Sequence, residues 1–129
     1  MSTNKIKSYG KSVLETEISG AKKLFKTINS DFAKVISKLS KIRGKVIITG
    51  VGKSGHIASK ISSTMSSTGT LSQYCSPTDM SHGDLGIITK NDAIIIISNS
   101  GKSAEFKSLL DFAKKNEVFV IGITSNAKS

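Results

Sequence analysis

The sequence predicts an α/β fold in which a doubly wound parallel sheet lies between two layers of helices, preceded by two N-terminal helices. Two observations carry this prediction. After Gly44, short apolar runs alternate with segments of helical periodicity, which is the rhythm of β–α–β units. The runs are apolar at consecutive positions, as expected for strands buried on both faces of a parallel sheet. The 129 residues suffice for one three-layer domain at most.

The first 43 residues carry the pattern of amphipathic helices. Asn29, Ser30 and Asp31 are good N-cap residues, so we predict helices over residues 8–28 and 31–42. Their apolar residues recur at spacings of three and four: Val13, Ile18, Ala21, Leu24, Phe25, Ile28, Phe32, Val35, Ile36 and Leu39. Such a pair covers the domain or forms an oligomer contact, and the sequence leaves both open.

The remaining chain, residues 44–129, is predicted to form the α/β domain. The expected strands are 45–49, 71–75, 92–97 and 118–124, and the expected helices are 55–67 and 103–115. Residues 76–91, with the single proline at Pro77, are expected to be a long irregular connection. Connections of this length are usually functional or mobile.

Composition narrows the classes of function. No apolar run approaches the ~20 residues that a membrane helix needs, and the N-terminus lacks the apolar stretch of a signal peptide. The single cysteine, Cys75, cannot form an internal disulfide, and we expect it to be buried rather than reactive. We therefore expect a cytoplasmic protein without a membrane partner.

The formal net charge of +10 raises the possibility of nucleic-acid binding. The lysines are spread along the chain, however, and Arg43 is the only arginine. Only 5% of the residues are aromatic, which leaves little for base stacking. We expect no nucleic-acid partner and interpret the lysines as a solubilising surface that attracts anionic metabolites.

Residues 50–55 match the dinucleotide fingerprint G-x-G-x-x-G, between an expected strand and an expected helix. A dinucleotide site also needs an acidic residue at the end of the next strand, and residues 73–76 read QYCS. Lys53 and Ser54 would crowd a pyrophosphate but suit a terminal phosphate. A P-loop is excluded because the required earlier glycine is missing.

A second small-residue loop follows the third expected strand. Ser98, Ser100 and Ser103 surround Gly101 at a predicted strand-to-helix turn, where hydroxyls and free helix amides can converge on an anion. These serines could equally be helix caps, with Ser103 the best candidate. Capping and phosphate binding use the same geometry, so both roles can hold.

Four segments together resemble the sugar isomerase (SIS) domain, a flavodoxin-like fold. They are residues 48–56 (ITGVGKSGH), 67–70 (STGT), 82–86 (HGDLG) and 98–101 (SNSG). Within this family, the four segments are similar to those of the KpsF/GutQ group, the arabinose-5-phosphate isomerases. That resemblance implies interconversion of ribulose 5-phosphate and arabinose 5-phosphate, a pentose phosphate substrate, and supply of the lipopolysaccharide sugar Kdo. It also implies a cytoplasmic homo-oligomer, a tetramer in this family.

The resemblance assigns roles residue by residue. Phosphosugar binding falls to Gly52, Ser54, Gly55, Ser98, Asn99, Ser100, Gly101 and Ser103. Lys53 matches an active-site lysine, Glu105 a glutamate important for catalysis, and His82 the histidine of the H-G-D-L-G loop. Isomerisation through an enediol needs a base and a group that stabilises an oxyanion, which Glu105 and Lys53 could supply.

Each of these residues also has a structural interpretation. Lys53 could only neutralise phosphate, Glu105 could only complement a helix dipole, and His82 could only hydrogen-bond its loop. We expect no metal, because His56, His82, Asp79 and Asp84 lack ligand spacing. No other cofactor is expected.

The chain departs from the family pattern at Lys102 and Asp79, where glutamate is usual, and at its end. The family continues with a fifth strand, further catalytic residues and often paired CBS domains. We therefore expect a fragment, a split or decayed gene product, or a site that a partner chain completes. Alongside the isomerase hypothesis stands a non-catalytic phosphosugar-binding module.

Overall fold

A computed structural model describes residues 2–102 and 104–126 and separates the chain after Lys38 into two units. In the first unit, α1 (Thr3–Lys23) tightens into a 3-10 turn, η1 (Leu24–Thr27). The Asn29 side-chain oxygen accepts hydrogen bonds from the amides of Asp31 (2.9 Å) and Phe32 (3.1 Å) and so caps α2 (Ser30–Leu39). The predicted pair of helices is confirmed, although the first begins earlier.

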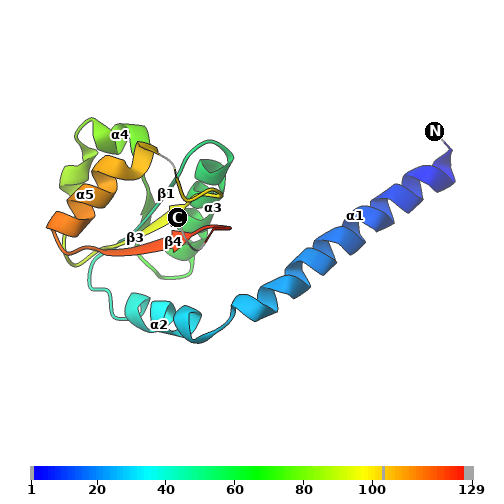
Figure 1. The fold of residues 1–129 in the computed structure, drawn as a ribbon, viewed down its shortest axis with the longest axis horizontal. Helices are drawn as coiled ribbons and strands as arrows, with labels where there is room; N and C mark the ends of the chain where they lie inside the picture. The colour runs from blue at the N-terminus through cyan, green and yellow to red at the C-terminus, as the bar shows by residue number, and fades with distance from the viewer. Residues whose placement is uncertain (1, 103, 127–129) are drawn as a thin grey trace. The chain divides into compact units, whose positions relative to one another are not determined.

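The second unit is built on a four-stranded parallel sheet. Its strands are β1 (Val46–Gly50), β2 (Ser72–Tyr74), β3 (Ala93–Ile97) and β4 (Phe119–Ile123). The order β2-β1-β3-β4 is that of a doubly wound sheet and confirms the predicted fold class (Figure 1). The register aligns Gly50, Ile97 and Ile123, so β1, β3 and β4 end together at one edge.

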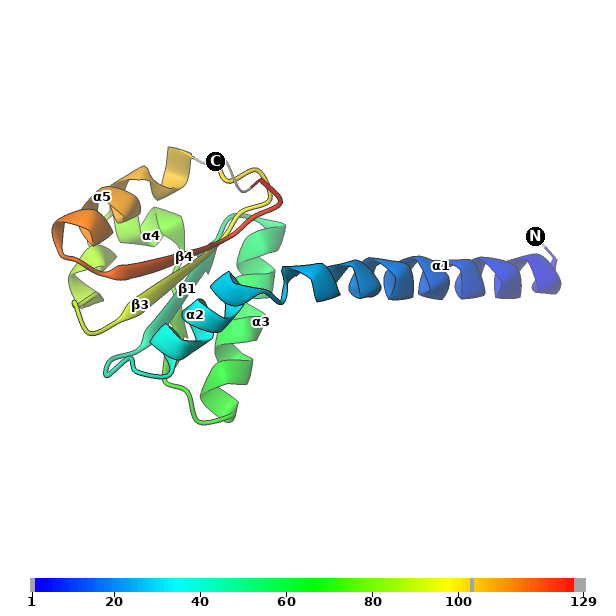
Figure 2. The ribbon, with the colours of Figure 1, turned by 60° about the horizontal axis from the view of Figure 1, so that its bottom comes forward.

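Helices cover both faces of this sheet (Figures 1 and 2). On one face, α3 (Lys53–Ser67) packs against β1 and β2. On the other face lie α4 (Pro77–Ser81) and α5 (Lys107–Lys115). The core between the sheet and α4 and α5 consists of Ile47, Cys75, Met80, Ile88, Ile94, Ile96, Phe106, Leu109, Ala113 and Val118.

The prediction of an irregular segment over 76–91 is wrong. The segment contains α4 and a 3-10 turn, η2 (Asp84–Ile87). Pro77 stands at the first helical position, where its fixed φ suits a helix and its missing N–H costs nothing. The helix expected from residue 103 also begins differently, as a 3-10 turn, η3 (Ala104–Phe106), that leads into α5.

A buried carboxylate ties the amino ends of β1 and β3 together. Asp92 is 2% exposed and accepts hydrogen bonds from the amides of Lys45 (2.7 Å) and Thr89 (2.7 Å). The Lys45 ammonium lies 3.3 Å from the same carboxylate and also donates to the Ile87 carbonyl. Burial raises the pKa of Asp92, but the hydrogen bonds from Lys45 and Thr89 outweigh it, and the pKa lies below its ordinary value.

Candidate functional site: a hydroxyl-lined pocket

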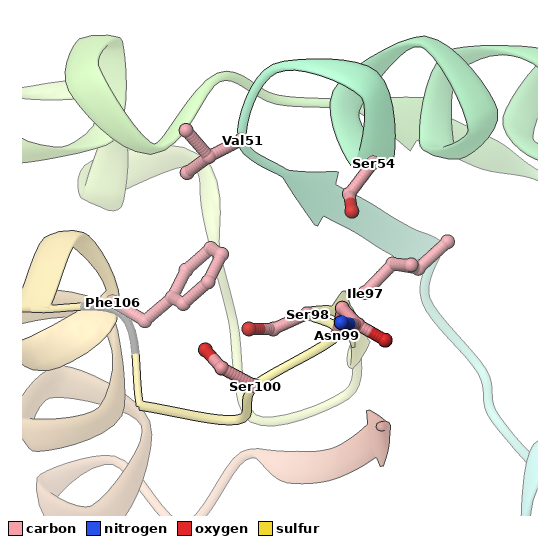
Figure 3. A pocket seen from close by; sticks show the side chains of 7 residues that line it. All are labelled: Val51, Ser54, Ile97, Ser98, Asn99, Ser100 and Phe106. Atoms are coloured by element: carbon pink, nitrogen blue, oxygen red, sulfur yellow. The ribbon is translucent and has the colours of Figure 1, made fainter. Parts of the chain in front are cut away.

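A pocket of about 360 Å³ opens at the carboxyl edge of the sheet. It lies between the loop that follows β1 and the loop that follows β3, where the strand order reverses direction. Ligands of doubly wound sheets bind at this switch point. The lining residues are Val51, Ser54, Ile97, Ser98, Asn99, Ser100 and Phe106 (Figure 3).

The first wall is the tight turn from β1 into α3. Gly52 has a φ of 56°, a conformation that favours glycine. A Cβ at Gly55 would lie 2.7 Å from the Gly50 carbonyl oxygen, so the small residue lets the helix begin against the strand end. This close approach places Ser54, in the first turn of α3, with its hydroxyl toward the pocket (Figure 3).

The second wall is the loop after β3, which is held by its own serines. The Gly101 amide donates to Ser98 Oγ (3.1 Å), and the Lys102 amide donates to Ser100 Oγ (3.3 Å). Ser98 is buried, at 8% exposure, whereas Ser100 is exposed. Because a hydroxyl that accepts one bond keeps its own proton, Ser100 retains a donor for a ligand.

The chemistry of the pocket suits an anion with several oxygens. Hydroxyl groups approach it from both walls, and none of the seven described lining residues carries a carboxylate. Lys53 and Lys102 are exposed and adjoin the two loops in sequence, which adds positive charge at this edge. Val51, Ile97 and Phe106 supply apolar surface for the body of a small ligand.

The structure brings together four of the predicted binding residues: Ser54, Ser98, Asn99 and Ser100 line the pocket. The predicted glycines build its walls without lining it, and Ser103 lies outside the described residues. Of the predicted catalytic residues, Lys53 directly precedes Ser54, and Glu105 directly precedes Phe106. His82 follows α4 and is exposed. None of these three is among the lining residues.

The apolar lining of the pocket was not predicted from the sequence. Val51 lies within the first motif and Ile97 directly precedes the second, and their positions beside strand ends could have indicated them. Phe106 was hidden because a 3-10 turn, not an α-helix, follows the second loop and carries the ring to the pocket. Over residues 2–102 and 104–126, no cluster of three metal-ligating side chains occurs. Within the same part of the chain, no helix is both long and apolar enough to span a bilayer.

The amino-acid sequence of this chain is similar to those of known proteins. The chain is 42% identical over 120 residues to the arabinose 5-phosphate isomerase KdsD of Yersinia pestis, covering 93% of this chain and 37% of that protein. It is 38% identical over 129 residues to the uncharacterized protein RP505 of Rickettsia prowazekii (strain Madrid E), covering 100% of this chain and 40% of that protein. The chain thus spans about two fifths of the length of these curated relatives.

Solved structures agree with the fold. The E. coli CFT073 protein c3406 in complex with arabinose 5-phosphate superposes with a TM-score of 0.91 at 37% identity, over 100% of this chain and 69% of that one. Phosphoheptose isomerase GmhA from Neisseria gonorrhoeae shares the fold at 17% identity, with a TM-score of 0.69, over 93% of this chain and 76% of that one. A family model described as the SIS domain matches residues 38–129. With that match over most of its length, the chain belongs to the SIS domain family.

Proposed function

We propose that the pocket binds a pentose phosphate and that the chain is part of an aldose–ketose isomerase of the arabinose-5-phosphate type. The observation that carries this proposal is the meeting of hydroxyls from Ser54, Ser98 and Ser100 at the switch point of the sheet. Relatives named arabinose 5-phosphate isomerase, and a solved structure in complex with arabinose 5-phosphate, support the choice of sugar phosphate.

In this proposal the phosphate is held by the hydroxyls and by the amides of the loop after β3. A phosphate monoester offers several acceptor oxygens, and the pocket presents donors from two elements. Lys53 and Lys102 contribute positive charge from outside the lining. The sugar carbons then lie along Val51 and Phe106. We assign ligand binding to residues 44–129, and residues 1–43 form a separate helical segment.

The proposed chemistry is a proton transfer between two sugar carbons. A base removes the proton from C2 of arabinose 5-phosphate, an enediol forms, and a proton delivered to C1 gives ribulose 5-phosphate. Glu105 is the proposed base, Lys53 stabilises charge on the oxygen, and His82 is a further proposed participant. The sequence neighbours of Lys53 and Glu105, which are Ser54 and Phe106, line the pocket and so support the first two assignments.

A second function, a phosphosugar-binding module without turnover, is favoured by a different observation. The described lining of the pocket includes serine hydroxyls that can donate to a phosphate, but it does not include Lys53, Glu105 or His82. In that case the chain senses or carries a sugar phosphate through the same loops. The two functions share the ligand and differ only in catalysis.

The wider biology of the proposal follows the family resemblance. We propose a cytoplasmic homo-oligomer that serves the pathway to the lipopolysaccharide sugar Kdo. α1 has no buried residue over Thr3–Lys23, which supports an oligomer contact through that helix.

Binding is tested by calorimetric titration of the full chain with arabinose 5-phosphate and, separately, with arabinose. We expect the phosphate ester to bind and to raise the melting temperature, and the free sugar to do neither. Ser54→Ala should weaken binding roughly threefold to tenfold, the worth of one hydrogen bond. Ser67→Ala, which removes a hydroxyl bonded to the Thr64 carbonyl at the other end of α3, is the control. Equal affinities for sugar and sugar phosphate would refute the proposal.

Turnover is tested by following ribulose 5-phosphate formation with wild type, Lys53→Ala and Glu105→Gln. Loss of activity in both variants, with sugar-phosphate binding retained in Glu105→Gln, supports the isomerase. Binding without turnover in wild type supports the module instead.

A further inference from the structure

The chain that follows β4 holds one carbonyl group of the loop after β3 through a set of hydrogen bonds, which we call the grip. Three donors converge on the Asn99 carbonyl oxygen: Thr124 Oγ1 at 3.2 Å, the Ser125 amide at 3.2 Å and Ser125 Oγ at 2.6 Å. A carbonyl oxygen has two lone pairs, so three donors exceed its usual complement. The Ser98 amide also donates to the Ile123 carbonyl at 3.1 Å, which joins the same two segments.

This grip fixes the direction of a peptide N–H. The Asn99–Ser100 peptide bond is trans, so the Asn99 carbonyl and the Ser100 N–H point in opposite directions. β3 lies between β1 and β4 in the sheet. A carbonyl held on the β4 side therefore directs the Ser100 N–H toward the β1 side, where Ser54 forms the opposite wall of the pocket (Figure 3).

The Ser100 N–H is available for a ligand. Among residues 2–102 and 104–126, no acceptor is hydrogen-bonded to it. Asn99 and Ser100 both line the pocket, so the amide between them borders the space that a ligand would fill. Without the grip from residues 124 and 125, the exposed peptide could rotate and withdraw this donor.

We propose that Thr124 and Ser125 are positioning residues, which hold the Asn99–Ser100 peptide so that its N–H donates to the phosphate of the bound sugar. This inference rests on the proposed sugar-phosphate binding. Neither residue lines the pocket or belongs to the two loop motifs, and both act through the Asn99 carbonyl. Their effect is on ligand affinity, beyond any effect on folding.

The first experiment measures the affinity of the full chain for arabinose 5-phosphate in matched variants. Ser125→Ala should bind roughly threefold to tenfold more weakly, and the double variant Thr124→Val/Ser125→Ala about tenfold or more. Ser125→Thr keeps the hydroxyl and should restore wild-type affinity, whereas Ser67→Ala should leave affinity unchanged. Wild-type affinity in the double variant would overturn the inference and leave the proposed function intact.

The second experiment needs no ligand. Hydrogen exchange of the Ser98 and Gly101 amides is measured by NMR in the unliganded chain. We expect both amides to exchange faster in the double variant than in wild type, and at the wild-type rate in Ser125→Thr. The melting temperatures of Ser125→Ala and Ser67→Ala should be equal. Unchanged exchange in the double variant would overturn the grip itself. If wild type binds no sugar phosphate, both the proposed function and the role of Thr124 and Ser125 in ligand affinity are refuted. Hydrogen exchange would still test whether the grip exists.

Discussion

Asp92 shows how much one buried side chain can contribute at the edge of this sheet opposite the pocket. Its pKa is held below the ordinary value of 3.8, because hydrogen bonds to the charged form outweigh burial. A lowered carboxylate pKa stabilises the fold fully above the unfolded-state value, and the contribution is lost as pH falls through the folded-state value.

We predict that Asp92→Asn lowers the free energy of unfolding by roughly 2 kcal/mol at pH 7, the worth of hydrogen bonds to a charged acceptor. The difference from wild type should shrink at pH 3, below the ordinary pKa of 3.8, because the unfolded wild-type chain then binds a proton at Asp92 more readily than the folded chain does. Urea denaturation at the two pH values measures both effects. A difference that is equal at both pH values would contradict the assignment.

Cys75 illustrates the opposite outcome of burial. Burial raises the pKa of its thiol above 9.0, the carboxylates of Asp84 and Asp79 raise it further, and Lys45 opposes them. Since the thiolate is the reactive form, we predict slow alkylation by iodoacetamide at pH 8 in the folded chain. The rate should rise by at least tenfold in denaturant. Equal rates in both states would show that the thiol is accessible and contradict the core assignment.

At the scale of elements, the junction of β1 and α3 depends on close approach. A Cβ at Gly55 would lie 2.7 Å from the Gly50 carbonyl oxygen and 3.0 Å from the Tyr74 hydroxyl oxygen. We predict that Gly55→Ala destabilises the fold by roughly 1–3 kcal/mol, although alanine is the better helix former.

Gly20→Ala is the matched control for this change, because Gly20 is also helical and a Cβ there would meet nothing within 4 Å. Thermal unfolding of both variants measures the difference: Gly20→Ala should be neutral or slightly stabilising, whereas Gly55→Ala should melt at a lower temperature than wild type. If Gly55→Ala behaves like Gly20→Ala, the junction has room for a side chain.

Elements differ in how far the sequence could predict them. The strands were predictable because a sheet covered on both faces needs apolar residues at consecutive positions, a pattern visible in a short stretch of sequence. The structure buries Ile47, Ile48 and Ile94 fully. α4 spans five residues, too few for a helical period, and its start depends on Pro77. The turn η3 moved the start of α5 because Phe106 packs into the core, which is a tertiary effect.

At the scale of the whole molecule, the site exists only because the sheet order reverses between β1 and β3. The two loop motifs were predicted from residue types, since hydroxyls and free helix amides at two neighbouring strand ends suit an anion. Their partnership with Thr124 and Ser125 could not be predicted, because the hydrogen bonds to Asn99 require β4 to lie beside β3. Sequence patterns locate motifs, and the tertiary fold decides which backbone groups they meet.

The apolar face of α1 provides the last prediction. Leu14 is 64% exposed and Ile18 is 54% exposed, and α1 buries no residue. An unpaired face of this kind is stabilised by burial against a second copy. We predict that the chain elutes as a homo-oligomer, with a light-scattering mass that is a multiple of 13.7 kDa.

The double variant Leu14→Lys/Ile18→Lys should reduce that mass to the monomer, because two buried charges would oppose the contact. Ser12→Lys/Ser19→Lys adds the same charge on the opposite face of the helix and should leave the mass unchanged. Sugar-phosphate affinity, measured in parallel, tells whether assembly also completes the site: if the oligomer supplies groups to the pocket, affinity falls only in the first variant. A monomeric wild type would contradict the role of α1 and leave the pocket to act within a single chain.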